Sequence, residues 1–405
     1  METLLKIASF VSGAAIVIGA ANSLLSTIVV PRAVRSRISF LSWLVVQKSF
    51  VKVVERLPRY EDKDRVLAFL GPVSLLAVLV VWIILFLAGY ALMFWALIEG
   101  SIGDALRLSG SSIFTLGVAS SAQAGPTVLE FLAAATGLIV VALQIGYLPT
   151  IYSAYNRRET LVTMLESRAG TPAWGPELLA RQQFSRGLNT LPALYSAWDA
   201  WAADVGESHA SYPWLMAFRS PYPLRSWIVG LLAVLDAAAM HLALAPETAP
   251  SEARYLLRMG FTALRSLATV TGQPYDDDPR PDAPLQLTFE EFAFGVDLVR
   301  RSGFPIERTA EEAWADFRGW RVNYESLSYD LAAYFVAVPA PWSGQRHHMT
   351  AMAAAEVLAK RPRHRSPRDP EGEFVGRFAI RPGAETADDA FEQALPVGSL
   401  DLVKD

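Results

Sequence analysis

Long uncharged runs dominate the first 160 residues of this 405-residue chain, whereas charged and apolar residues alternate in the rest. The clearest run extends from Val66 to Ile98 without one charged side chain, which is longer than the roughly 20 residues needed to cross a bilayer. A second run covers about Val128 to Tyr152, with Glu130 near its start and Gln144 deeper in. The pattern predicts two transmembrane helices, at 66–98 and 128–155.

A third apolar stretch occupies residues 7–30. A cleaved signal peptide is the alternative interpretation. However, the stretch is longer than a signal h-region, and the only charges ahead of it are Glu2 and Lys6, which do not form a basic n-region. We therefore expect a retained transmembrane helix within residues 1–31.

Residues 38–57 are largely apolar, with interspersed charges at Lys48, Lys52, Glu55 and Arg56. This pattern suits an amphipathic helix lying in the membrane interface, within a segment that covers residues 32–65. A linker helix packed on protein is the alternative.

Basic residues flank the apolar runs asymmetrically, and such a bias sets membrane orientation. They follow the first run, at Arg32, Arg35 and Arg37, and the last run, at Arg157 and Arg158. The connection at 99–126 holds Glu99, Asp104 and Arg107 as its charged residues. We expect a multi-pass protein of the plasma (inner) membrane, with the N-terminus outside and the C-terminal half cytoplasmic.

The connection between the second and third runs, residues 99–126, is too short for a domain and too apolar for an ordinary solvent loop. Residues 102–114 are suited to a short helix, and the small residues that follow suit a chain reversal. Irregular backbone at membrane depth is tolerated only where it lines a water-filled path or is buried in protein.

After this short helix comes the run Thr115, Leu116, Gly117, Val118, Ala119 and Ser120. Its first three residues match the Thr-x-Gly that opens the selectivity filter of the potassium-channel superfamily, so residues 66–158 resemble that family's pore unit. The resemblance implies a pore helix and filter at 102–120, with residues 115–119 as the ion-binding segment. It also implies a homotetramer in the lipid bilayer, with K⁺ or Na⁺ as the permeant ion.

The residues after Gly117 depart from the family pattern. Val118 stands in place of the aromatic residue, Ala119 in place of the second glycine and Ser120 in place of the acid. Because alanine resists the positive φ that glycine adopts freely, relaxed selectivity, fewer binding sites and a non-conducting filter all stay open. The alternative function is a non-conducting receptor or scaffold that keeps the pore-like fold for assembly.

Three residues in the last apolar run favour helix bending: Gly137, Gly146 and Pro149. Gly137 resembles the hinge glycine of the family's inner helices, so the three are candidate gating positions. The alternative is that the glycines permit close helix packing.

The rest of the chain predicts an all-helical cytoplasmic domain at 159–358 and a flexible tail at 359–405. Residues 226–245 are long enough for a fourth span, but Asp236 near the centre favours a buried core helix.

Composition narrows the chemistry. The net charge is −4 and nucleic-acid motifs are absent, so nucleic acid is not an expected partner. There is no cysteine, and the five histidines lack ligand spacing, so we expect no metal site, no cofactor and no enzymatic activity. The acidic run at 276–282 suits a solvated linker or, alternatively, a divalent-cation site. No regulatory ligand is indicated.

Overall fold

The computed structural model describes residues 2–30, 36–184 and 187–344, and within them the chain is entirely helical. The predicted tail at 359–405 therefore lies outside the described residues. The elements, in chain order, are α1 (Glu2–Ile28), α2 (Arg37–Val54), α3 (Tyr60–Leu67), α4 (Leu70–Leu97), α5 (Ile102–Ile113), α6 (Ala124–Ala169), α7 (Gly175–Phe184), η1 (Leu188–Thr190), α8 (Leu191–Ser211), η2 (Pro213–Ala217), α9 (Trp227–Leu244), α10 (Ser251–Thr271), α11 (Phe289–Arg301), α12 (Ala310–Arg321) and α13 (Glu325–Tyr334).

The chain forms two compact units. The first contains residues 1–56 and 66–154, and the second contains residues 57–65 and the chain from residue 155 onward. Residues 60–65 of helix α3 thus belong to the second unit, although the sequence pattern places them in the linker before the outer helix.

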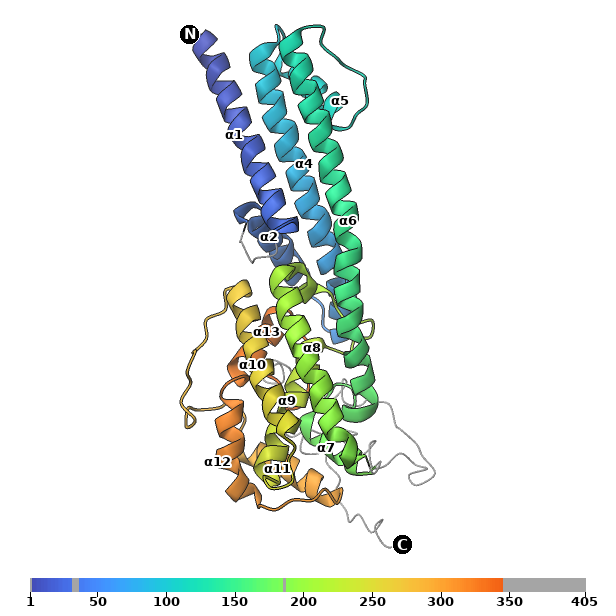
Figure 1. Cartoon of the computed structure of the whole chain (residues 1–405), viewed down its shortest axis with the longest axis vertical. Helices are drawn as coiled ribbons and strands as arrows, with labels where there is room; N and C mark the ends of the chain where they lie inside the picture. Colours follow the sequence, from blue (N-terminus) through green and yellow to red (C-terminus); the bar gives the residue numbers. More distant parts are fainter. Residues whose placement is uncertain (1, 31–35, 185–186, 345–405) are drawn as a thin grey trace. The chain divides into compact units, whose positions relative to one another are not determined.

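Close backbone contact brings α1 and α4 side by side in the first unit (Figure 1). A Cβ atom placed on Gly13 would lie 2.4 Å from the carbonyl oxygen of Gly89, so only glycine fits at this crossing. Further along, the indole Nε1 of Trp82 donates a hydrogen bond of 2.9 Å to the hydroxyl of Ser23. The Ser9 hydroxyl also donates a hydrogen bond of 2.9 Å to the carbonyl of Leu92. Small residues and these two hydrogen bonds therefore hold the helix pair together.

Helix α6 is one uninterrupted helix from Ala124 to Ala169, with Pro149 inside it. Its first part packs in the first unit, where the Tyr90 hydroxyl of α4 lies 2.8 Å from the Thr136 hydroxyl. The helix extends well past the predicted end at residue 155 and enters the second unit.

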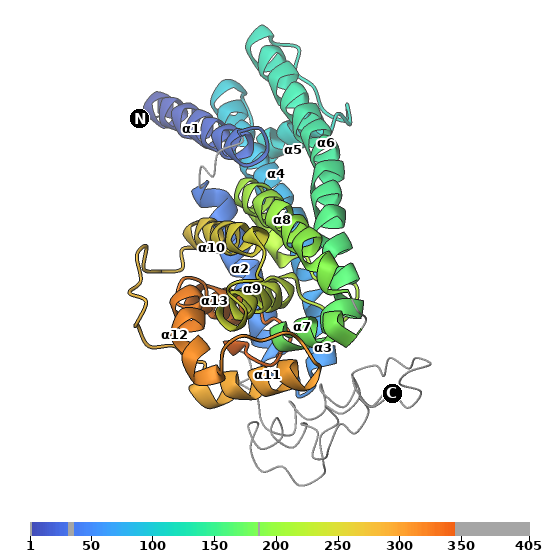
Figure 2. The same cartoon turned by 60° about the horizontal axis from the view of Figure 1, so that its bottom comes forward.

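The second unit is built around α9, which Figure 2 shows among the surrounding helices. Every residue of α9 is buried, and α7, α8, α10, α12 and α13 pack against it. A helix that is apolar on all sides is buried on all sides, and here other helices of the same unit provide the cover.

Asp236, near the middle of this helix, and His241, in its last turn, have separate partners. Asp236 forms an ion pair with Arg321 and accepts a hydrogen bond of 2.9 Å from the Tyr324 hydroxyl. His241 lies 3.2 Å from the Tyr195 hydroxyl through its Nδ1 atom.

Among the described residues, four helices are long and apolar enough to cross a membrane: α1, the segment Tyr60–Leu97, α6 and α9. The prediction of an all-helical chain with membrane-spanning helices is confirmed at that level. By length and composition α9 resembles the other three. It differs from them because its apolar segment is wholly buried within the protein.

Candidate functional site

The first part of the candidate site is the short helix α5, which begins at a well-formed cap. The Ser101 hydroxyl accepts a hydrogen bond of 3.2 Å from the backbone N–H of Asp104, and the Asp104 carboxylate accepts one of 3.0 Å from the N–H of Ser101. This reciprocal capping box fixes where the helix starts, so that only residues 98–101 separate it from the end of α4 at Leu97.

From that start, α5 packs back along α4 (Figure 1). The Ser109 hydroxyl donates a hydrogen bond of 2.9 Å to the carbonyl of Leu87, which lies about 15 Å along α4 from its C-terminal end. The last residue of α5, Ile113, contacts Gly137, about 20 Å along α6 from its first residue. The C-terminal end of α5 therefore lies deep between the two long helices.

The contact at Gly137 is as close as the backbone permits. A Cβ atom at this position would lie 2.0 Å from the carbonyl oxygen of Ile113, so any other residue would displace α5. At Gly146 a Cβ atom would meet nothing within 4 Å. Of the three predicted hinge residues, Gly137 has a packing role, while α6 runs through Gly146 and Pro149 without a break. Whether any of them is a hinge stays a prediction.

After α5 the chain adopts an irregular conformation in which two of the five predicted filter residues have positive φ. Thr115 has a φ of 54° and Gly117 a φ of 68°. Glycine adopts this left-handed region freely, but threonine does so at a cost of about 1–2 kcal/mol. Such strain in a non-glycine residue is frequent at functional sites.

The end of the predicted filter is fixed by a serine that the sequence analysis did not single out. The Ser111 hydroxyl donates a hydrogen bond of 2.8 Å to the carbonyl of Ala119, and the Ala119 N–H donates one of 3.0 Å to the same hydroxyl. One side chain on α5 thus pairs with both polar backbone groups of Ala119. The available signal was the group of serines near the end of the predicted short helix, at positions 109, 111 and 112.

The chain then returns to the start of α6. The N–H of Ser121 donates a hydrogen bond of 2.7 Å to the Glu130 carboxylate, and the Thr127 hydroxyl donates one of 3.1 Å to the carbonyl of Ser121. These bonds close a loop whose residues 114–118 are all exposed in the single chain. The structure thus places residues 115–119 together in one loop, whose last residue, Ala119, is held by hydrogen bonds to Ser111.

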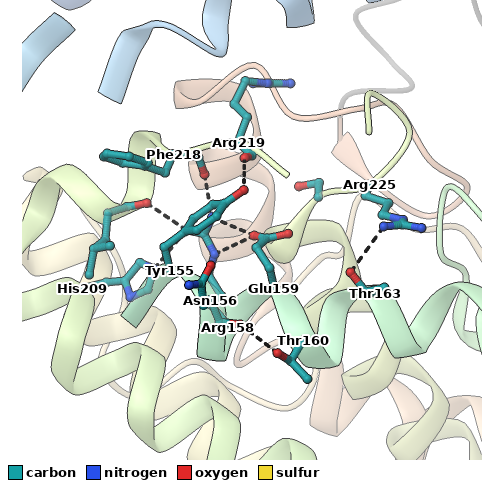
Figure 3. Close-up of polar contacts among 12 residues, drawn as sticks. Tyr155, Asn156, Arg158, Glu159, Thr160, Thr163, His209, Phe218, Arg219 and Arg225 are labelled. Carbon is teal, nitrogen blue, oxygen red and sulfur yellow. Dashed lines mark hydrogen bonds and ion pairs between the residues drawn. The ribbon is translucent and has the colours of Figure 1, made fainter. Parts of the chain in front are cut away.

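A second polar group lies in the second unit, on the last four turns of α6 (Figure 3). The Arg158 side chain is completely buried and uses all five of its N–H donors. They reach the Glu159 carboxylate at 2.9 and 2.8 Å, His209 Nε2 at 3.1 Å, and the carbonyls of Leu215 at 2.8 Å and Phe218 at 2.6 Å. In the sequence, Arg158 contributed only to the prediction of membrane orientation.

The contact with Arg158 also determines the state of His209. Because the guanidinium can only donate, His209 must accept at Nε2 and is therefore neutral. Burial and then the positive charge of Arg158 hold the pKa of His209 well below its usual value near 6.5. Its other nitrogen, Nδ1, lies 3.0 Å from the Ser208 hydroxyl.

Comparisons with known proteins give a limited result. No family model matches the chain, and no solved structure matches it. A curated relative, "Uncharacterized membrane protein YdjJ" of Bacillus subtilis (strain 168), is 26% identical over 189 residues, which cover 44% of this chain. The matched region spans about half of that relative's own length, 54%. In agreement with this relative's description, the chain is a membrane protein with transmembrane helices.

Proposed function

We propose that the chain is a tetrameric cation channel of the potassium-channel type, with residues 115–119 as a degenerate filter that conducts monovalent cations. The observation that carries the proposal is the position of α5. Its C-terminal end contacts Gly137, about 20 Å into α6, so the irregular backbone that follows starts at membrane depth. Backbone in that position requires either protein cover or a water-filled path.

The chemistry of the loop favours cations. The C-terminal end of a helix carries a partial negative charge, and in α5 this end leads directly into Thr115. Hydroxyl and carbonyl oxygens are the groups that replace the hydration shell of a monovalent cation in a filter. Four copies around an axis would provide the ring of oxygens, because one chain supplies a quarter of it.

The conformation and hydrogen bonds of Ala119, at the end of the loop, favour weak selectivity between K⁺ and Na⁺. Ala119 is not among the residues with positive φ, and both of its backbone groups are hydrogen-bonded to Ser111. We therefore propose fewer ion sites than in a filter with a second glycine.

In this proposal the membrane spans are α1, α4 and α6. Helix α9 belongs to a cytoplasmic helical domain, which its complete burial among amphipathic helices supports. The N-terminus and the loop after α5 face outside the plasma membrane, as the flanking basic residues predict.

The test is cation flux into liposomes containing the purified chain, with two neighbouring serines compared. Ser111→Ala removes the hydroxyl that fixes Ala119, whereas Ser112→Ala removes one that bonds only to Leu108 of the same helix. We expect flux in the wild type, a changed K⁺/Na⁺ ratio in Ser111→Ala and wild-type behaviour in Ser112→Ala. A tetramer without flux in any monovalent salt contradicts the proposal.

A non-conducting receptor or scaffold is the second candidate. The observation that favours it is the apolar character of the exposed loop side chains, with Leu116 at 62% and Val118 at 61% exposure. If these side chains meet on the axis, they exclude water and hold the assembly together. Absence of flux together with loss of the tetramer on replacing Leu116 by Ser would support this candidate.

A further inference from the structure

One short segment of the second unit contacts both helices that lead into the membrane. We call residues 215–225, between α8 and α9, the clasp. On one side it lies along the last turns of α6 (Figure 3). Arg158 binds the carbonyls of Leu215 and Phe218, and the Tyr155 hydroxyl donates a hydrogen bond of 3.1 Å to the carbonyl of Arg219.

The contact with α6 continues for about two further turns. At the end of the clasp, Arg225 forms an ion pair with Glu166 and donates a hydrogen bond of 3.3 Å to the Thr163 hydroxyl. Tyr155, Arg158, Thr163 and Glu166 thus bind the clasp along one side of α6. This side of the helix is held by polar contacts at both ends of the clasp.

On its other side the clasp binds α3 through the Arg219 side chain. The guanidinium forms an ion pair with Asp64 and a hydrogen bond with the Tyr60 hydroxyl. It also donates to the carbonyls of Phe335 at 2.9 Å and Val336 at 3.1 Å, which follow α13. Both charged side chains are nearly buried, with 11% of Arg219 and 9% of Asp64 exposed.

Arg219 therefore binds α6 with its main chain and α3 with its side chain. Loss of Asp64 would leave a nearly buried guanidinium without its counter-charge, which is the costly way to break such a pair. The disturbance would pass directly to the carbonyl that Tyr155 holds, because both groups belong to one residue. Polar contacts in this arrangement are coupled rather than independent.

The two helices that the clasp binds, α3 and α6, are connected by the chain to the helices beside the loop of residues 114–119. Helix α3 ends at Leu67 and α4 begins at Leu70, while α6 is continuous with its membrane part. We propose that the clasp couples α3 to α6, so that the chain entering α4 and the chain leaving α6 move as one body. In a channel this coupling would transmit a rearrangement of the second unit to the pore, and that consequence rests on the proposed function.

The coupling can be measured without ion flux, by hydrogen exchange on the full chain in lipid nanodiscs. Asp64→Asn keeps the shape of the side chain but removes its charge. We expect the amides of residues 155–166 on α6 to exchange about tenfold faster, although Asp64 is on α3. The matched control is Asp62→Asn on the same helix. It breaks only an exposed ion pair with Arg65, and the α6 rates should stay within twofold of the wild type.

The reverse substitution tests the same coupling from the α6 side. Tyr155→Phe removes one hydroxyl without changing charge, so it serves even if Asp64→Asn does not fold. It should speed exchange in residues 60–67. If Asp64→Asn changes α3 alone and Tyr155→Phe changes α6 alone, the two helices are independent and the coupling is refuted.

Ion flux then separates this inference from the proposed function. In a conducting wild type, the effects of Asp64→Asn and Tyr155→Phe on flux should be non-additive in the double variant. If the wild type conducts no ion while the exchange effects cross from one helix to the other, the channel proposal fails and the coupling stands.

Discussion

At the scale of single residues, His209 gives the second unit a defined pH dependence. Its pKa in the folded chain is far below 6.5, mainly because of burial and then because of Arg158. In the unfolded chain it titrates near 6.5. As the pH falls below about 6.5, the unfolded chain gains a proton that the folded chain does not, so the free energy of unfolding falls by up to about 1.4 kcal/mol per pH unit. Above that pH the contribution is constant.

The His209→Gln variant isolates this effect. Glutamine offers an amide oxygen to Arg158 but does not titrate, so the variant should lose this part of the slope below pH 6.5. Tryptophan fluorescence reports unfolding, because Trp227 packs on His209 with ring centroids 5.4 Å apart. Equal pH slopes for wild type and variant would show that His209 takes up its proton in the folded state.

At the scale of elements, the packing of α5 on α6 depends on glycine at position 137, because glycine carries no Cβ atom. Gly137→Ala would place a carbon 2.0 Å from the Ile113 carbonyl, whereas Gly146→Ala on the same helix meets nothing within 4 Å. Overpacking of this kind costs about 1–3 kcal/mol. We expect a lower thermal midpoint in detergent for Gly137→Ala only.

The matched pair also separates packing from bending. Both substitutions raise helix propensity equally, so a change in gating that both variants share reflects stiffness of α6. If Gly146→Ala lowers the thermal midpoint as much as Gly137→Ala, close contact with α5 is not the reason for the glycine.

The sequence predicted these elements well where hydrophobicity decides them. Uncharged runs located α1, α4 and the first part of α6, and Asp236 favoured the buried form of α9 that the structure has. The ends of the helices were harder to predict. Arg157 and Arg158 predict a membrane boundary by their charge, but nothing local shows that α6 continues to Ala169.

The contacts that define the sites could be predicted only in part. Thr115 and Gly117 could be singled out because the motif that opens a filter is short and local, and their role in ion binding stays a prediction. The clasp was missed because Asp64 and Arg219 are 155 positions apart, and no periodic pattern links residues at that separation. The same holds for Arg158, whose partners other than Glu159 lie 51 to 60 positions away.

At the scale of the whole molecule, the loop of residues 114–118 is exposed in the single chain and needs cover in a membrane. Other copies of the chain provide this cover if their loops meet around an axis. Such a meeting of the loops is the central requirement of a tetrameric pore. The absence of cysteine makes this testable, because one introduced thiol is the only one in the protein.

Val118→Cys should place thiols from neighbouring copies near one axis, and mild oxidation in lipid should then give a disulfide-linked dimer band. The band should not exceed a dimer, because each thiol pairs with one other. Leu25→Cys is the control, since Leu25 is also exposed, at 48%, but lies on α1, which the pore arrangement places at the periphery. Cross-linking through Leu25→Cys and none through Val118→Cys would mean that the copies meet along α1, and the loop would then face lipid or protein instead of an axis.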